Sequence, residues 1–177
     1  CASHAETKSE ITLFTDASKT GWGAVLFSDA CPSYLEYGER ADGVTVAGWW
    51  KGPERYRKIA ELEAVAVSRA LRHFAKEIRG RKVNVWVDNT SILGAIRKTQ
   101  SPSFWLNDKI RDIVMASEAS GTELHFAYVP TKHNRADQPS RQPVPNTSHV
   151  SEKRVYGGGG KFSPILARKN KSEGGRV

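Results

Sequence analysis

The sequence has little cysteine and no long hydrophobic run. Its 177 residues include only two cysteines, Cys1 and Cys31, which excludes a disulfide framework and a four-cysteine zinc site. No apolar run approaches the ~20 residues that a membrane-spanning helix needs, and the polar start lacks the apolar stretch of a signal peptide. We therefore expect an intracellular protein, cytoplasmic or nuclear, or a fragment of a larger one.

Composition and length are those of a folded domain. Hydrophobic residues make up 38% of the chain, which excludes wholesale disorder, and 177 residues favour one compact domain. The net charge of +8 favours anionic partners, because neutralising phosphates releases condensed counterions. Charge alone leaves two interpretations open, nucleic-acid binding and a merely soluble basic surface.

Charge and turn-forming residues are unevenly distributed along the chain. Residues 143–177 carry a net charge of +5 and contain scattered prolines and the run Gly157 to Gly160. This composition predicts a flexible basic tail. We therefore predict a flexible segment at 1–10, a folded domain at 11–142 and the tail at 143–177.

The hydrophobic pattern predicts an α/β fold with the element order β-β-β-α-β-α-α-β. A tight turn at Ser18 to Gly21 joins the first two strands, and Gly80 closes the longest helix. The predicted elements are a hairpin over 11–27, strands over 44–50, 83–87 and 123–129, and helices over 56–79, 90–98 and 104–119, the last with Trp105, Ile110, Ile113 and Val114 as its buried stripe. A meander followed by crossovers implies a mixed five-stranded sheet with helices packed on it.

Two aspartates stand at the ends of predicted strands. Asp16 ends the first strand and Asp88 follows the fourth. Either one alone is typical of a turn or a helix cap. Because the carboxyl ends of neighbouring parallel strands border one crevice, the two together suggest a polar site that needs a third member.

The longest predicted helix supplies another carboxylate. At ~100° per residue, Glu63 shares a helix face with Leu71 and Phe74, which predicts that it points toward the sheet. A buried, unpaired charge is costly, so this position needs a cation, a metal ion or a proton. Glu61 lies off that face, and we expect it to be a solvated first-turn acid favoured by the helix dipole.

Asp137 follows the last predicted strand, where an ordinary surface aspartate beside Arg135 or Arg141 is the alternative. Three or four carboxylates without a cysteine or histidine cluster make an all-oxygen site, which suits Mg²⁺ or Mn²⁺ and not zinc. Two such ions ~4 Å apart would activate a water and stabilise the leaving oxygen in phosphodiester hydrolysis.

Four sequence blocks carry a family resemblance. They are Leu13 to Leu26, the Glu-x-x-Ala-Val-x-x-Ala-Leu of Glu63 to Leu71, Val87 to Asn89, and the Asn-x-Ala-Asp-x-x-Ser-Arg of Asn134 to Arg141. In this order they resemble the catalytic blocks of the type 1 RNase H fold, in the form fused to reverse transcriptases. The middle blocks are most similar to DIRS, Ngaro and VIPER-type retroelements, and the last block is also similar to hepadnaviral polymerases.

The resemblance implies metal-dependent cleavage of the RNA strand of an RNA–DNA hybrid. It assigns Asp16, Glu63, Asp88 and Asp137 as catalytic residues and as ligands of two Mg²⁺ or Mn²⁺ ions. It implies substrate contacts by Ser18, Asn89, Thr90, His133, Asn134 and Arg141. The implied partners are the hybrid and the polymerase domain of the same polyprotein.

The sequence departs from its relatives in three places. Cellular members carry a basic, Trp-rich insertion after the second helix, where Thr99 to Phe104 is a short link here. Retroviral and cellular members place a His where this sequence has Ala127, so His133 is either an aid to product release or an ordinary loop residue. The hepadnaviral pattern would align Glu61 rather than Glu63 as the metal ligand.

Two functions of different classes follow from these observations. The first is an endoribonuclease within a retroelement polymerase, which the presence of all four acids favours. The second is a catalytically silent RNase H-like tether or hybrid-binding module. An integrase-like nuclease of the same superfold is disfavoured by the block at Asn134 to Arg141.

Overall fold

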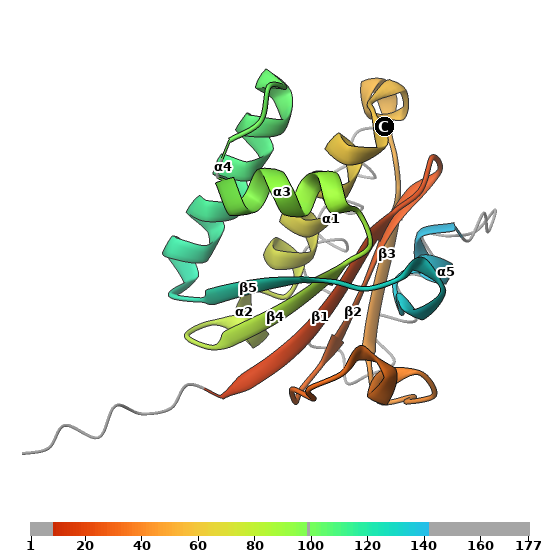
Figure 1. Ribbon diagram of the computed structural model, residues 1–177, viewed down its shortest axis with the longest axis vertical. Coiled ribbons are helices and arrows are strands. Elements are labelled where there is room, and N and C mark those ends of the chain that lie inside the picture. Colours follow the sequence, from red (N-terminus) through yellow and green to blue (C-terminus); the bar gives the residue numbers. More distant parts are fainter. Residues whose placement is uncertain (1–8, 99, 142–177) are drawn as a thin grey trace, which may run out of the picture.

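The computed structural model describes residues 9–98 and 100–141 (Figure 1). The predicted tail at 143–177 and nearly all of the predicted segment at 1–10 lie outside these residues. Five strands form one sheet in the order β3-β2-β1-β4-β5. They span Glu10–Ala17 (β1), Gly21–Phe27 (β2), Val44–Trp49 (β3), Lys82–Val87 (β4) and Glu123–Tyr128 (β5).

The sheet is mixed. β1 pairs antiparallel with β2, and β2 pairs antiparallel with β3. On the other side, β1 pairs parallel with β4, and β4 pairs parallel with β5. This confirms the predicted mixed five-stranded α/β fold, because a hairpin meander is followed by crossovers through helices.

Five α-helices accompany the sheet in the described part of the chain. They span Ile59–His73 (α1), Ala75–Ile78 (α2), Thr90–Lys98 (α3), Phe104–Ser120 (α4) and Asp137–Arg141 (α5). α1 packs on β1 and β2, and α4 packs on α1. Among the described helices, none combines the length and apolar character needed to cross a bilayer.

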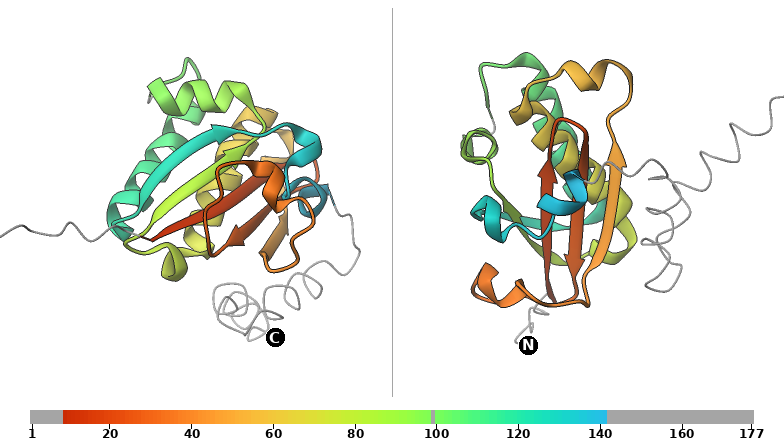
Figure 2. Two further views of the ribbon diagram at one scale, coloured as in Figure 1. Left: turned by 60° about the horizontal axis from the view of Figure 1, so that its bottom comes forward. Right: turned by 90° about the vertical axis from the view of Figure 1, so that its right-hand side faces the viewer.

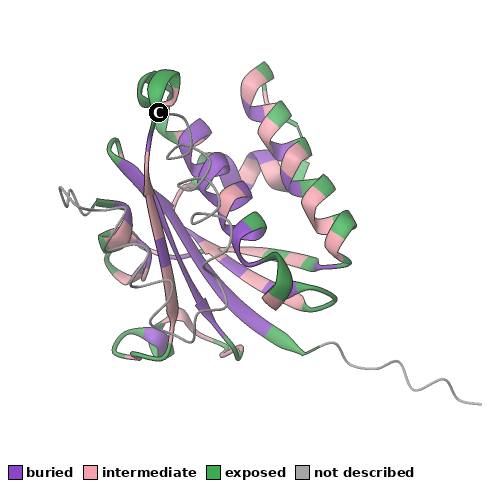
Figure 3. Cartoon of the chain, turned by 180° about the vertical axis from the view of Figure 1, so that it is seen from behind, coloured by how far each residue is buried: buried purple, intermediate pink, exposed green. Residues whose placement is uncertain are grey.

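The two faces of the sheet are covered differently (Figures 2 and 3). Buried aliphatic residues of β1, β4, α1, α3 and α4 form one large cluster on the helical face. A smaller, aromatic-rich cluster on the other face contains Phe14, Phe27 and Tyr37, with Val129 and Ala136 from the segment before α5. This second cluster anchors the chain that leads to α5.

The structure corrects three details of the predicted elements. The helix predicted at 56–79 begins at Ile59 and is interrupted at Phe74, whose backbone angles are φ −93° and ψ 16°. Val114 is exposed rather than part of the buried stripe of α4, whose buried residues are Leu106, Ile110 and Ile113. The short helix α5 was not predicted.

Candidate active site

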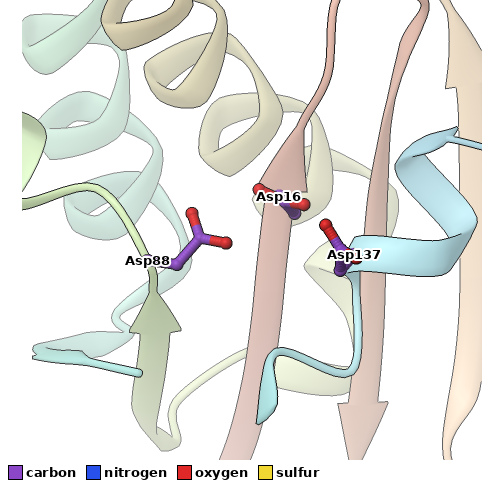
Figure 4. Close-up of side chains that lie close together, drawn as sticks. All are labelled: Asp16, Asp88 and Asp137. Atoms are coloured by element: carbon purple, nitrogen blue, oxygen red, sulfur yellow. The ribbon is translucent and has the colours of Figure 1, made fainter. Parts of the chain in front are cut away.

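Asp16 and Asp88 lie at the same edge of the sheet. β1 and β4 run parallel, and their register pairs Phe14 with Trp86, so Asp16 and Asp88 are the next equivalent positions toward the carboxyl ends. Asp16 is the penultimate residue of β1, and Asp88 directly follows β4. Both side chains point toward the same space (Figure 4).

The helix α5 brings a third aspartate to this edge. Asp137 is its first residue, and α5 packs against β2. This approach depends on Gly23, because a Cβ there would lie 2.8 Å from both Pro139 Cβ and the Ser140 nitrogen. Asp16, Asp88 and Asp137 thereby offer carboxylate oxygens that lie within 4.8 Å of one another.

Glu63 of α1 lies next to this group and is buried. Its Oε2 atom has no hydrogen-bond partner. Burial, followed by the charge of Asp16, raises the pKa of Glu63 to about 10. Burial, followed by the charge of Asp88, raises the pKa of Asp16 to about 7.

The chemistry of this donor set fits a hard divalent cation. The set consists of oxygens only, which is the preference of Mg²⁺ and Mn²⁺. Clustered carboxylates repel one another unless a proton or a cation compensates them, and the raised pKa values of Asp16 and Glu63 express that repulsion together with burial. An unpartnered carboxylate oxygen beside such a cluster is a further free ligand atom.

Each aspartate also accepts a hydrogen bond from a neighbouring polar side chain. Ser140 Oγ donates to Asp16 Oδ2 at 3.1 Å, and Asn134 Nδ2 donates to Asp88 Oδ2 at 3.2 Å. Arg141 Nε donates to Asp137 Oδ1 at 2.8 Å, forming an ion pair one turn along α5. Ser140 was not among the predicted site residues, although it stands in the block that predicted Asp137.

Asp16, Glu63 and Asp88 line an open cleft of about 560 Å³. Three predicted site residues besides the acids line this cleft. Ser18, Asn89 and Arg141 line the cleft, together with Lys19, Thr20, Ile59 and Thr131, which the sequence did not single out. A strand end, a helix start and two loops therefore share this one concave surface.

The other predicted substrate-binding residues, Thr90, His133 and Asn134, do not line the cleft. Asn89 Oδ1 accepts a hydrogen bond from the Ile92 N–H and so caps α3, whose first residue, Thr90, is exposed. The ring of His133 packs on Tyr34, with 5.3 Å between centroids, in the direction of the aromatic cluster. Asn134 is buried. The substrate-binding roles of these residues stay predictions.

Glu61 corrects the expectation of a solvated acid, since only 8% of its surface is exposed. Its Oε1 accepts from Ser103 Oγ at 3.5 Å, and its Oε2 lies 3.8 Å from Arg57 Nη1. The start of α4 covers this side of α1, and that tertiary contact cannot be read from the helical pattern of α1 alone. Glu61 does not line the cleft.

Solved structures define the fold class. RNase H1 of the halophilic archaeon Halobacterium salinarum NRC-1 is 16% identical, covering 73% of this chain and 93% of that chain with a TM-score of 0.56. LC11-RNase H1, solved in complex with an RNA/DNA hybrid, is 18% identical, covering 75% and 93% with a TM-score of 0.56. The N-terminal RNase H domain of a Mycobacterium tuberculosis protein is 12% identical, covering 81% and 96% with a TM-score of 0.55. At these identities the likeness establishes the RNase H-like fold alone.

The family follows from the sequence match. The family model described as "RNase H-like domain found in reverse transcriptase" matches residues 6–109, and the chain belongs to this family. The matched residues include Asp16, Glu63 and Asp88 and end before Asp137. No curated protein matches the chain.

Proposed function

We propose that the chain is an endoribonuclease that hydrolyses the RNA strand of RNA–DNA hybrids with two divalent cations. The observation that carries this proposal is the convergence of Asp16, Asp88 and Asp137 beside the buried Glu63, next to an open cleft. A module that only binds a hybrid has no need of clustered carboxylates, because they repel its phosphates.

The four acids would hold Mg²⁺ or Mn²⁺ through their carboxylate oxygens. When bound, these ions supply activation of a water and stabilisation of the leaving oxygen. In the metal-free chain, the raised pKa values mean that Asp16 and Glu63 retain protons to higher pH than ordinary carboxyl groups. Cation binding would displace those protons, so we expect activity to rise with pH across the neutral range.

The walls of the cleft favour a nucleic-acid strand as the substrate. Arg141 and Lys19 contribute positive charge to the same cleft as the acids, which suits the phosphates on either side of the cut. Hydrolysis next to a 2′-OH, in a helix whose minor groove is wide enough to enter, would exclude a DNA duplex as substrate. The solved relative in complex with an RNA/DNA hybrid supports this substrate class.

Family membership supports a place within a reverse transcriptase. We propose that this polymerase belongs to a retroelement of the DIRS or Ngaro type and that the domain degrades genomic RNA after first-strand synthesis. The polymerase domain would then be a covalent partner that delivers the hybrid.

The test is a cleavage assay with labelled RNA–DNA hybrid, RNA duplex and DNA duplex, in Mg²⁺, in Mn²⁺ and in chelator. We expect wild-type chain to cut only the RNA strand of the hybrid and only with metal, and Asp16→Asn to be inactive. Glu118→Gln removes an exposed carboxylate at the far end of α4 and serves as the matched control. Equal cutting of DNA duplex contradicts the proposal, and hybrid binding without cleavage favours the silent module.

A further inference from the structure

Asn134 has no side-chain N–H left to donate to a substrate. Its Nδ2 donates to the Thr15 carbonyl at 3.1 Å and to Asp88 Oδ2 at 3.2 Å, and its Oδ1 accepts from the Ala136 N–H at 3.0 Å. The residue is only 6% exposed. Both amide hydrogens are therefore used in hydrogen bonds, one to the main chain of β1 and one to the Asp88 carboxylate of the candidate site.

Ser140 plays an equivalent part at the other end of the same segment. It is 2% exposed, and its Oγ lies 3.1 Å from Asp16 Oδ2 and 2.8 Å from the Asp137 carbonyl oxygen. Its own carbonyl accepts from Ser18 Oγ at 2.6 Å. The hydroxyl thus ties the start of α5 to the carboxylate of β1.

We propose that Asn134 and Ser140 form a carboxylate clamp, that is, a pair of positioning residues that orient Asp88 and Asp16 for the cations. This inference rests on the proposed function. The two residues flank Asp137, so one segment of seven residues carries the third carboxylate and holds the two that come from the ends of β1 and β4. Hydrogen-bonded partners of metal ligands set ligand orientation, and losing one typically weakens metal affinity by ~10–100-fold.

The test measures Mn²⁺ affinity of the full 177-residue chain by calorimetry without substrate. We expect the Kd for Mn²⁺ to rise by about 10-fold or more in Asn134→Ala and in Ser140→Ala, and the Mn²⁺ concentration for half-maximal hybrid cleavage to rise with it. Gln138→Ala removes an exposed polar side chain from the same segment and should bind Mn²⁺ as wild type does. Ser140→Thr keeps the hydroxyl and should retain affinity.

The outcomes separate the two proposals. An unchanged Kd in folded Asn134→Ala and Ser140→Ala contradicts the clamp, as does equal weakening in Ser140→Thr and Ser140→Ala. The thermal midpoint shows whether an alanine variant is unfolded. If Ser140→Ala is unfolded, the Mn²⁺ Kd of Ser140→Thr tests whether the hydroxyl is what maintains the affinity. A wild-type chain that binds no Mn²⁺ contradicts the proposed function itself.

A second, independent observation concerns exposed aromatic side chains. Tyr56 and Phe104 are 89% and 90% exposed. Tyr56 ends a short 3-10 helix, Gly52–Tyr56, just before α1, and Phe104 begins α4. Nearly full exposure of two aromatic rings marks a surface for interaction.

Cations lie on a third aromatic ring, that of Trp105, which directly follows Phe104. The ring of Trp105 has Arg57 at 4.6 Å and Lys109 at 5.0 Å from its centroid. The segment 51–58 contains four Lys or Arg residues and one acid, Glu54, which is ion-paired with Arg69. We define Tyr56, Arg57, Lys58, Phe104, Trp105 and Lys109 as the aromatic–basic patch.

The patch adjoins the cleft. Ile59 lines the cleft, and Tyr56 precedes it by three residues, so their Cα atoms are at most about 11 Å apart. The starts of α1 and α4 lie at the same end of the molecule (Figure 2). Positive charge with exposed aromatic rings is the combination that holds nucleic-acid backbones and bases.

We propose that the aromatic–basic patch binds the hybrid beside the cleft, an inference that also rests on the proposed function. Where cellular members carry a basic, Trp-rich insertion, this sequence has only the short link Thr99 to Phe104. The aromatic–basic patch would supply affinity for the duplex in its place. Its basic character selects a polyanion over a neutral or basic protein surface.

Hybrid affinity measured in an Asp16→Asn background, which leaves the substrate uncut, tests this patch. We expect the double substitution Tyr56→Ala and Phe104→Ala to raise the hybrid Kd by at least about fivefold. Lys58→Gln should reduce the salt slope of log affinity by up to about 0.9. Met115→Ala, which trims an exposed side chain elsewhere on α4, is the control.

Unchanged affinity and salt slope in these variants contradict the patch as a hybrid site and leave a protein partner as its occupant. If the Asp16→Asn chain binds no hybrid at all while the wild type cuts none, the proposed function fails instead. The two failures are therefore distinguishable.

Discussion

Two glutamates on α1, only two residues apart, have opposite surroundings. Glu61 faces a hydroxyl of Ser103 and the guanidinium of Arg57, and it lies in the first turn of its helix. Glu63 faces the carboxylates of Asp16 and Asp88. The Oε2 atom of each glutamate accepts no hydrogen bond, but that of Glu61 lies 3.8 Å from the Arg57 guanidinium. Both are buried.

Burial alone therefore does not mark a metal ligand. The charge of Glu61 is compensated by a cation and by the helix dipole. The charge of Glu63 is opposed by its neighbours, so the protein must supply a proton or a metal ion there. The sign of the surroundings, rather than the depth of the residue, identifies the candidate ligand.

The largest effect should come from exchanging each carboxylate for an amide. Glu63→Gln should reduce hybrid cleavage by at least ~100-fold, because a charged ligand contributes several kcal/mol to a metal-assisted step. Glu61→Gln should retain most activity. Single-turnover cleavage rates at fixed Mg²⁺ measure both, and loss of activity in Glu61→Gln alone would favour the hepadnaviral alignment.

Metal-induced stabilisation should differ between the same two variants. A ligand present at 100 times its Kd stabilises the folded state by about 2.7 kcal/mol. Wild type and Glu61→Gln should gain this stability with Mn²⁺, and Glu63→Gln should lose much of the gain. Without metal, Glu63→Gln should be neutral or stabilising, since the amide is uncharged at every pH and the carboxyl group must hold a proton beside its acidic neighbours. Thermal unfolding with and without Mn²⁺ tests this, and equal gains in all three chains would contradict it.

The pH dependence of stability in chelator sharpens the comparison further. The pKa of Asp16 is raised from 3.8 to about 7 and that of Glu63 from 4.5 to about 10, so the folded chain binds more protons than the unfolded chain in between. Their contribution to stability is full below about pH 4 and is lost as pH rises through 7 toward 10.

Glu63→Gln should flatten this decline, and Glu61→Gln should preserve it. Unfolding midpoints between about pH 5 and pH 9 in chelator provide the measurement. A slope that is the same in wild type and Glu63→Gln would show that Glu63 is ionised in the folded, metal-free chain.

The smallest effect is expected from removing the Ser103 hydroxyl, which contacts Glu61. Ser103 caps α4 by accepting from the Leu106 N–H, and it also bonds Glu61. Ser103→Ala should cost about 1 kcal/mol of stability, as loss of an N-cap does, and should leave the Mn²⁺ Kd unchanged. Denaturant unfolding measures the stability, and calorimetry measures the Mn²⁺ affinity. A weakened Mn²⁺ affinity would show that the surroundings of Glu61 contribute to the metal site at Glu63.

Local patterns predicted most of the fold and the principal acids. The hairpin at 11–27 and the strand at 83–87 follow from short-range alternation, and Asp16 and Asp88 follow from their position at strand ends. The inward direction of Glu63 follows from helix periodicity, since it needs no knowledge of other elements. These features depend on residues close together in sequence.

The features that were missed depend on tertiary packing. Glu61 is buried by the start of α4, more than forty residues along the chain. The hydrogen bonds of the Asn134 amide and of the Ser140 hydroxyl depend on how the segment of α5 packs against Gly23 of β2. These contacts join residues that lie far apart in the sequence, so no local pattern predicts them.

The most direct measurement is anomalous scattering from crystals of the chain grown with Mn²⁺ and an RNA–DNA hybrid that resists cleavage. We expect Mn²⁺ peaks bounded by Asp16, Glu63, Asp88 and Asp137, with the Glu61 side chain still in contact with Ser103 and Arg57. Peaks bound at Glu61, or a hybrid seated in the cleft with no Mn²⁺ between the carboxylates, would contradict it.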